Sequence, residues 1–241
     1  VPALETIGVR QLLNGPESFT PDGNFILGEA PEVQRYFVGA GFNAFGIAAA
    51  GGAGKALAAW IVDGEPPYDL WPVDIRRFGR PHQDTRWVRT RTQEMYAKHY
   101  TISWPFEEDD SGRPLRKSPL YEKLRTAGAC FGEKLGWERP NWFAPEGVEP
   151  RDEHSFGRQN WFPYTSEEHR AVREAVGLFD QSSFAKFLLQ GRDSESVLQR
   201  LCANDVGVEP GTIVYTAMLN SRGGIESDLT ITRTPEDGSL I

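Results

Sequence analysis

YFVGAGFNAFG, the stretch at residues 36–46, contains a short apolar run that leads directly into a glycine turn. The apolar run at 36–40 predicts a buried strand. The Ala- and Gly-rich residues 47–62 that follow predict a helix. This helix should end at the DGEPP of residues 63–67, because glycine favours a left-handed stop and the prolines forbid continuation. Strand, glycine turn and helix in this order are typical of a nucleotide-binding α/β layer.

The glycine turn alone is a weak signal for a dinucleotide. Gly39 and Gly41 begin a G-x-G-x-x-G pattern, but Ala44 occupies the position of its third glycine. Two interpretations of the helix therefore stay open: tight packing on a sheet, or free N–H groups at the helix start that face an anionic ligand. Both use a stripe of small residues that recurs every fourth position, namely Gly46, Ala50, Gly54 and Ala58.

The middle segment, 78–158, is rich in Trp, Tyr, Arg and Pro. It predicts two helices, at about 84–99 and 120–127, and much irregular chain. Its aromatic residues are better explained by core packing than by a stacking platform for a ligand.

The last segment, 159–241, has a clearer rhythm of elements. A helix is expected from Ser166 through Val176, with acidic residues in its first turn, where the helix dipole favours them. A strand at 184–190 and a helix at 193–201 should follow. Strands at 212–219 and 225–232 should form a hairpin around the glycine-containing turn at 220–224.

Asp228 is the best candidate acid in this hairpin. On a strand it would share one face with Thr230, while Leu229 would point to the other face. A solvated polar face explains Asp228 as well as a ligand site does. Tyr215 and Met218 of the preceding strand should point to opposite faces, so that both line one pocket only where the strand ends or twists.

Composition excludes several functional classes. The 241 residues are 39% hydrophobic and 25% charged, with a net charge of −8, which is typical of a globular chain and argues against nucleic-acid binding. No apolar run approaches the length of a membrane span. Cys130 and Cys202 and the four histidines lack metal-ligand spacing, so we expect reduced thiols and no metal site. Residues 1–5 lack the charged and apolar regions of a secretory signal, so we expect none.

The two ends of the chain suggest an internal piece of a longer protein. The first residue is Val1 rather than Met, and the chain stops where a strand would begin after a turn at 235–238. We therefore expect an internal fragment.

Groups of motifs along the chain carry a family resemblance. The NGP at 14–16, the TPDG at 20–23 and the GAGFNAFG at 39–46 resemble the end of the FAD domain in D-amino-acid-oxidase-like (DAO-like) flavoproteins. With DIRRF at 74–78 and GWERP at 136–140, the chain looks like sarcosine dehydrogenase and its dimethylglycine dehydrogenase relatives.

The remaining motifs, YTAMLN at 215–220, RGGI at 222–225 and SDLT at 227–230, resemble the GcvT-like, folate-binding aminomethyltransferase domain that follows in that family. The resemblance implies a mixed α+β and α/β fold. Its expected parts are the C-terminal part of a DAO-like FAD domain at 1–77, an FAD-dependent oxidoreductase central domain at 78–158, and the start of the folate-binding domain at 159–241.

The resemblance also implies two cofactors, FAD and tetrahydrofolate, and the residues that touch them. The FAD contacts carry over onto Gly41, Phe42, Asn43, Ala44, Phe45, Gly46, Ile47 and Ala48. The folate contacts carry over onto Tyr215, Met218, Asp228, Leu229 and Thr230. The catalytic residues for amine oxidation remain unknown, and we expect most of them to lie outside this chain.

The implied activity is FAD-dependent demethylation of an N-methyl amine such as sarcosine or dimethylglycine, with the one-carbon unit passed to tetrahydrofolate. The implied partners are that amine and an electron acceptor, in the bacterial cytoplasm or the mitochondrial matrix, and the fragment alone should be inactive. A non-catalytic regulatory protein, like the pyruvate dehydrogenase phosphatase regulatory subunit, is the main alternative. A free-standing aminomethyltransferase is a weaker one, because the first segment is flavoprotein-like.

Overall fold

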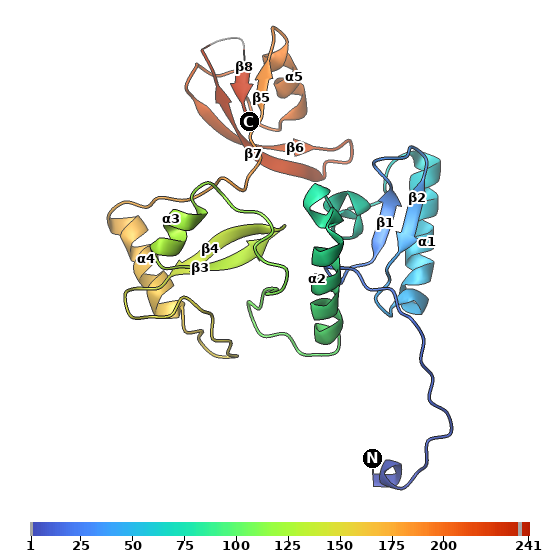
Figure 1. The fold of residues 1–241 in the computed structure, drawn as a ribbon. Coiled ribbons are helices and arrows are strands. Elements are labelled where there is room, and N and C mark those ends of the chain that lie inside the picture. The colour runs from blue at the N-terminus through green and yellow to red at the C-terminus, as the bar shows by residue number, and fades with distance from the viewer. Residues whose placement is uncertain (1, 236–237) are drawn as a thin grey trace. The chain divides into compact units, whose positions relative to one another are not determined.

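The computed structural model describes residues 2–235 and 238–241 and divides the chain into two compact units, Val1–Asp180 and Gln181–Ile241 (Figure 1). The first unit combines helices with two small antiparallel sheets, and the second is a four-stranded sheet with one α-helix. The mixed fold class expected from the sequence is confirmed.

The first unit opens with the short 3-10 helix η1 (Pro2–Glu5) and then a hairpin covered by a helix. Strand β1 (Ile26–Glu29) pairs antiparallel with β2 (Phe37–Ala40), and α1 (Gly46–Asp63) follows the glycine turn. Gly64 ends α1 in the left-handed conformation, with a φ of 79°, as the sequence predicted.

The face of α1 that packs is not the stripe of small residues considered from the sequence. Ala53, Ala56 and Trp60 are buried, because their spacing of three and four places them on one side of the helix. Ala50, Gly54 and Ala58 are exposed, so tight packing of that stripe is wrong for this structure. The bulky Trp60 supplies the contact area that small residues cannot.

Short 3-10 helices lead from α1 to the middle of the chain: η2 (Trp71–Val73), η3 (Ile75–Arg77) and η4 (Arg80–Gln83). Helix α2 (Thr85–Lys98) then begins at Asp84, whose side chain accepts a hydrogen bond from the N–H of Arg86. Both α2 and the shorter α3 (Tyr121–Thr126) confirm their sequence predictions.

A second hairpin completes the first unit. Strand β3 (Ala129–Lys134) pairs antiparallel with β4 (Trp137–Phe143), with a bulge between Cys130 and Phe131. Trp142 is 1% exposed and stacks on Tyr164 of α4 (Phe162–Glu174) at 5.2 Å, which joins the helix to the sheet.

Helix α4 begins four residues before the predicted start at Ser166. Pro163 lies in its first turn, where a missing N–H costs nothing, and the half-buried ring of Trp161 at the N-cap packs against the core. The first turn therefore contains no acidic residue, and that detail of the prediction is wrong. The carboxylate of Glu168 accepts a hydrogen bond from the N–H of Phe143 at 2.7 Å instead.

The second unit contains β5 (Leu188–Gln190), α5 (Ser194–Leu201), β6 (Ile213–Leu219), β7 (Ile225–Arg233) and β8 (Gly238–Leu240), in the sheet order β5-β8-β7-β6. Leu198, Val206 and Ile231 form its core. The β6–β7 hairpin is confirmed.

Strand β5 is shorter than the predicted strand at 184–190. The N–H of Phe184 bonds to the carbonyl of Gln181 at 3.1 Å, which forms a turn where the strand was expected to begin. The turn predicted at 235–238 falls partly outside the described residues.

Candidate functional site

The turn between β2 and α1 holds a run of backbone conformations with positive φ. Gly41 has φ 64°, Asn43 φ 48° and Ala44 φ 67°. A Cβ atom at Gly41 would lie 2.5 Å from the Cγ2 of Thr20, so glycine is required there by space as well as by conformation. The chain therefore reverses tightly before α1 begins.

Asn43 fixes this turn to the segment that precedes β1. Its Oδ1 accepts the N–H of Thr20 at 2.9 Å, its Nδ2 donates to the carbonyl of Gly41 at 2.7 Å, and its own N–H donates to the carbonyl of Ser18 at 3.0 Å. The residue is 2% exposed. Asn43 thus positions the turn from within, and its side chain faces away from solvent.

The start of α1 is left uncapped. No side chain bonds to it, and the N–H groups of Gly46, Ile47 and Ala48 have no hydrogen-bond partner among the described residues. The N–H of Ala49 is the first along α1 to donate a hydrogen bond, which the carbonyl of Phe45 accepts at 2.9 Å. Ile47 and Ala48 are exposed, so three aligned donors with a positive helix dipole are accessible to an anion or an electron-rich ring edge.

Aromatic rings flank the turn. Phe42 stacks on Phe25 with ring centroids 5.1 Å apart, so its ring is used in packing. Phe45 is 58% exposed and lies 5.1 Å from the imidazole of His99. Of the residues predicted to touch FAD, the structure therefore brings the exposed Ala44, Phe45, Ile47 and Ala48 to one end of α1.

A groove near this turn was missed by the sequence reasoning. It has a volume of about 930 Å³ and is lined by residues 13–15 and 17–19 and by Thr92, Gln93 and Tyr96 of α2. Phe19 meets Tyr96 edge to face at 5.1 Å, and the Oγ1 of Thr92 is buried without a partner among the described residues. The two walls lie far apart in the sequence, so no local pattern could have revealed it.

The second unit presents the predicted folate residues on two faces. Tyr215 donates its hydroxyl hydrogen to the Oδ2 of Asp228 at 2.8 Å, and Thr230 pairs with Tyr215 across the β6–β7 ladder. This hydrogen bond, together with the charge of Asp228, raises the pKa of Tyr215. A phenol and a carboxylate thus form one exposed polar surface.

Met218 and Leu229 lie on the opposite face, packed against the core of Leu198, Val206 and Ile231. The expectation that Tyr215 and Met218 point to opposite faces agrees with the contacts, because the Met218 side chain joins the core while that of Tyr215 is 66% exposed. A ligand on the polar face would therefore meet the side chains of Tyr215, Asp228 and Thr230.

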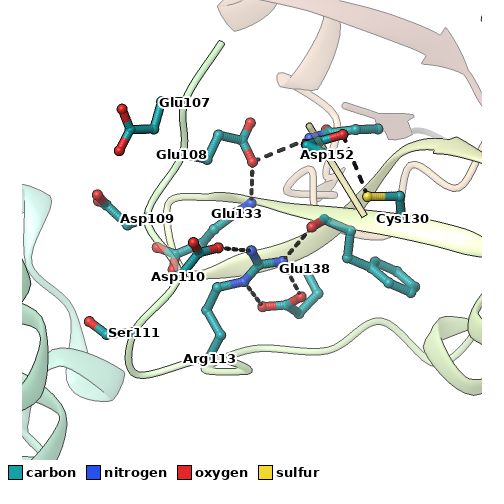
Figure 2. A network of polar contacts seen from close by, with 12 residues as sticks. Glu107, Glu108, Asp109, Asp110, Ser111, Arg113, Cys130, Glu133, Glu138 and Asp152 are labelled. Atoms are coloured by element: carbon teal, nitrogen blue, oxygen red, sulfur yellow. Dashed lines mark hydrogen bonds and ion pairs between the residues drawn. The ribbon is translucent and has the colours of Figure 1, made fainter. Parts of the chain in front are cut away.

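Ion pairs in the first unit attach the acidic loop at 107–111 to its neighbours. The guanidinium of Arg91, 3% exposed, donates to Asp109 at 3.1 Å and pairs with Glu133. The guanidinium of Arg113 donates two hydrogen bonds, of 2.9 and 2.7 Å, to the carboxylate of Glu138 (Figure 2). These pairs stabilise the arrangement of loop and sheet and present no reactive group.

Two further groups have shifted pKa values. Burial would raise the pKa of Glu94, but Lys98 and donors from Ser111 and Asp110 lower it to about 2. Burial and the charge of Asp152 raise the pKa of Cys130 to about 12, so its thiol stays protonated. Among the described residues no group of His, Cys, Asp or Glu is arranged to hold a metal ion, and no helix could cross a membrane.

Comparison with known proteins assigns most of the chain to two family models. The model of the FAD dependent oxidoreductase central domain matches residues 63–118, and the model of the GCVT N-terminal domain matches residues 120–241. The boundaries we expect from the sequence, at 77 and 158, stay a prediction.

Several characterised proteins are similar to this chain over nearly all of its length. 4-Methylaminobutanoate oxidase (formaldehyde-forming) of Paenarthrobacter nicotinovorans is 46% identical, across 100% of this chain and 29% of that protein. Mitochondrial sarcosine dehydrogenase of Homo sapiens is 42% identical, across 97% and 28%. The mitochondrial pyruvate dehydrogenase phosphatase regulatory subunit of Mus musculus is 42% identical, across 97% and 27%. The chain thus spans less than a third of each relative.

Proposed function

The chain belongs to the sarcosine and dimethylglycine dehydrogenase family of FAD-dependent oxidoreductases, and from this premise we propose that the whole protein oxidises a small N-methyl amine. Sarcosine and dimethylglycine are the substrates we favour. Bound FAD would supply the two-electron oxidation of the N-methyl carbon. The amine and an electron acceptor would be the partners of the reaction.

The observation that carries this proposal is the uncapped start of α1. The N–H groups of Gly46, Ile47 and Ala48 are free among the described residues and are held in place by the turn that Asn43 fixes. They would hold the edge of the flavin ring where negative charge gathers on reduction. Ala44, Gly46 and Ala48 at this end are small residues, and the exposed rings and alkyl groups of Phe45 and Ile47 offer apolar contact to a flat ring.

The second unit would receive the one-carbon unit. Asp228 and Tyr215 offer a carboxylate and a phenol on one exposed face, and a pterin presents ring N–H and amino groups that a carboxylate accepts. We propose that tetrahydrofolate takes the methylene group from the oxidised amine. The relative named formaldehyde-forming suggests the other fate, in which water attacks and free formaldehyde leaves.

The cellular location that we propose depends on whether the organism is eukaryotic or bacterial. The named animal relatives are mitochondrial proteins. We propose the mitochondrial matrix for a eukaryotic source and the cytoplasm for a bacterial one.

A regulatory role is the second candidate. The mouse regulatory subunit is as similar to this chain as human sarcosine dehydrogenase is, at 42% identity. In that case the same units would form a binding scaffold and no amine would be oxidised.

The test uses the full-length protein that contains this chain. We would record its visible spectrum, add sarcosine, dimethylglycine or 4-methylaminobutanoate without oxygen, and follow flavin bleaching. Bound flavin that one of these amines bleaches supports the dehydrogenase. Bound flavin that none of them bleaches, or an absence of flavin, contradicts it and favours the regulatory role. Product analysis with and without tetrahydrofolate then separates folate transfer from formaldehyde release.

A further inference from the structure

A cleft in the first unit is lined by none of the residues of the two proposed cofactor surfaces. Its volume is about 430 Å³, and it lies between the acidic loop, the β3–β4 hairpin and the start of α4. The residues that line it are Phe106, Glu107, Glu108, Lys134, Asn141, Trp142, Asp152, Trp161 and Thr165. The lining thus combines aromatic rings with three carboxylates and a single cation, Lys134.

The side chain of Glu108 is held against the β3–β4 hairpin by hydrogen bonds from both strands. Its Oε2 accepts the N–H of Glu133 at 2.8 Å and the Nδ2 of Asn141 at 3.3 Å, as Figure 2 shows for the Glu133 contact. The carboxylate lies over Gly132 of β3, where any Cβ atom would overlap it. The other oxygen, Oε1, has no hydrogen-bond partner among the described residues.

Asp152 is anchored in the same manner on the other wall. Its Oδ1 accepts the indole N–H of Trp142 at 2.7 Å and the thiol of Cys130 at 3.7 Å. Both donors are neutral, so the negative charge of Asp152 is not balanced by them. Its Oδ2, like the Oε1 of Glu108, has no hydrogen-bond partner among the residues that the structure describes.

The charges of these two carboxylates are not neutralised by the protein. Neither Glu108 nor Asp152 forms an ion pair with any residue that the structure describes, whereas Glu107 pairs with Lys98 at 3.2 Å. A partly enclosed carboxylate without a neighbouring cation has lost part of its hydration, which costs free energy. A bound cation would offset that cost, so the cleft attracts positive charge. Lys134 is exposed and makes no ion pair in the described part of the chain.

Two aromatic side chains add a surface for alkyl groups and cations. Phe106 and Trp161 meet edge to face, with ring centroids 5.6 Å apart. Phe106 is held at a φ of 62°, which a bulky side chain rarely adopts. Aromatic faces beside carboxylates recognise organic ammonium groups, because the rings attract the cation and shed water from its alkyl part.

We propose that this cleft binds a primary or secondary alkylammonium group, with its N–H donors on Glu108 and Asp152 and its alkyl part on Phe106 and Trp161. A free amine and a lysine side chain of another protein share this chemistry. The inference does not rest on the flavin assignment, since none of these residues belongs to the turn or to α1.

The experiment is fluorine NMR on the 241-residue chain labelled with fluorotryptophan, with the resonance of Trp161 assigned from a Trp161→Phe variant. Propylammonium chloride is the probe, and propanol is its neutral match. We expect the Trp161 resonance to shift saturably in the millimolar range with propylammonium and not with propanol. An N-acetylated lysine methyl ester, added separately, tests the side-chain source.

Matched variants locate the site. Glu108→Gln and Asp152→Asn keep the shapes and the accepting oxygens, and each should weaken binding by about tenfold or more. Asp110→Asn, an exposed acid of the same loop outside the cleft, should change binding by less than about twofold. Lys134→Met should tighten binding, because it removes the competing cation.

The proposal would be overturned by the absence of a saturable shift, by an equal shift with propanol, or by unchanged binding in both Glu108→Gln and Asp152→Asn. The same shift on adding magnesium or calcium chloride alone would show a metal site and would also overturn it. Circular dichroism melting of each variant checks the fold, and the effect of Lys134→Met offers an independent test if a carboxylate variant unfolds.

Discussion

At the residue scale, Glu94 links α2 to the acidic loop. Its carboxylate accepts the N–H groups of Asp110 and Ser111 at 2.9 and 2.8 Å and pairs with Lys98 at 2.8 Å. These contacts outweigh burial and hold its pKa at about 2 in the folded chain. A carboxyl with a lowered folded pKa stabilises the fold above its unfolded pKa, and this stabilisation is lost as the pH falls toward the folded pKa.

We therefore predict that Glu94→Gln lowers the free energy of unfolding at pH 7 by about 1.5–3 kcal/mol. The difference from the unchanged chain should shrink as the pH falls from about 5 toward 2, because the wild-type carboxyl then takes up a proton. Urea unfolding at several pH values measures it. Glu146→Gln, at an exposed acid, is the control, and a difference independent of pH would contradict the assignment.

A substitution at Asp228 can distinguish the proposed folate site from the proposed flavin site by experiment. Asp228→Asn keeps the shape and removes the charge that Tyr215 meets at 2.8 Å. In the full-length protein we predict at least a roughly tenfold loss of folate affinity, the size expected for a hydrogen bond to a charged group. Flavin reduction by amine without folate should stay near wild type, as measured by anaerobic stopped flow.

The opposite pattern, lost flavin reduction with intact folate binding, would show that the second unit has another role. If neither quantity changed, a solvated polar face would be the better account of Asp228. The pKa of Tyr215 offers a second readout, because it should fall toward its ordinary value once the negative charge of Asp228 is removed.

At the element scale, the start of α1 is where a change of charge should be felt by a flavin. Ala48 is exposed in the first turn and no side chain caps the helix. We predict that Ala48→Asp in the full-length protein lowers the flavin reduction potential, because the new charge opposes the negative charge gained on reduction. A redox titration measures it, with Ala48→Asn as the neutral match.

A potential that Ala48→Asp left unchanged or raised would count against a flavin at this turn. The neutral Ala48→Asn variant should lie between wild type and Ala48→Asp, because the amide adds bulk without charge. This comparison separates electrostatics from a steric effect on flavin binding.

Elements whose signals are local could be predicted from the sequence. The strand at 36–40, the helix stop at 63–67 and the turn at 220–224 all correspond to elements of the structure, because glycine and proline act within a few residues. The expectation that the strand is buried is wrong, because Phe37 and Val38 are half-buried and Gly39 and Ala40 are exposed. The start of α4 was missed because the acids at Glu167 and Glu168 suggested a first turn, while Trp161 and Pro163 set it earlier.

Contacts between distant residues could not be predicted. Asn43 is fixed by Thr20, 23 residues away, whereas the family resemblance implied only that Asn43 lies in a turn that touches FAD. The face of α1 that packs depends on Trp60 meeting the ring of Phe37 across the β1–β2 hairpin at 6.0 Å. The cleft around Glu108 joins the loop, hairpin and helix of the first unit, so its chemistry appears only in three dimensions.

At the scale of the whole molecule, each compact unit contains its own cluster of buried hydrophobic residues among those that the structure describes. Trp142 belongs to the cluster of the first unit and Leu198 to that of the second. Each unit therefore has its own source of stability.

We predict that the 241-residue chain by itself folds but does not retain FAD in equal molar amount. A full G-x-G-x-x-G turn, which would hold the cofactor's phosphates, does not occur in its sequence. The measurement is gel filtration after incubation with FAD, followed by a visible spectrum, with circular dichroism as the control for folding. Stoichiometric flavin that an N-methyl amine bleaches would contradict this prediction.

The close approach of the Glu108 carboxylate to Gly132 has a consequence for how such chains vary through evolution. A side chain at position 132 would displace the Glu108 carboxylate from its hydrogen bonds to Glu133 and Asn141, so positions 132 and 108 should change together. Homologues with a larger residue at the first should carry a shorter residue at the second. Descendants that kept the acid should have kept the glycine, even in lineages where the rest of strand β3 diverged.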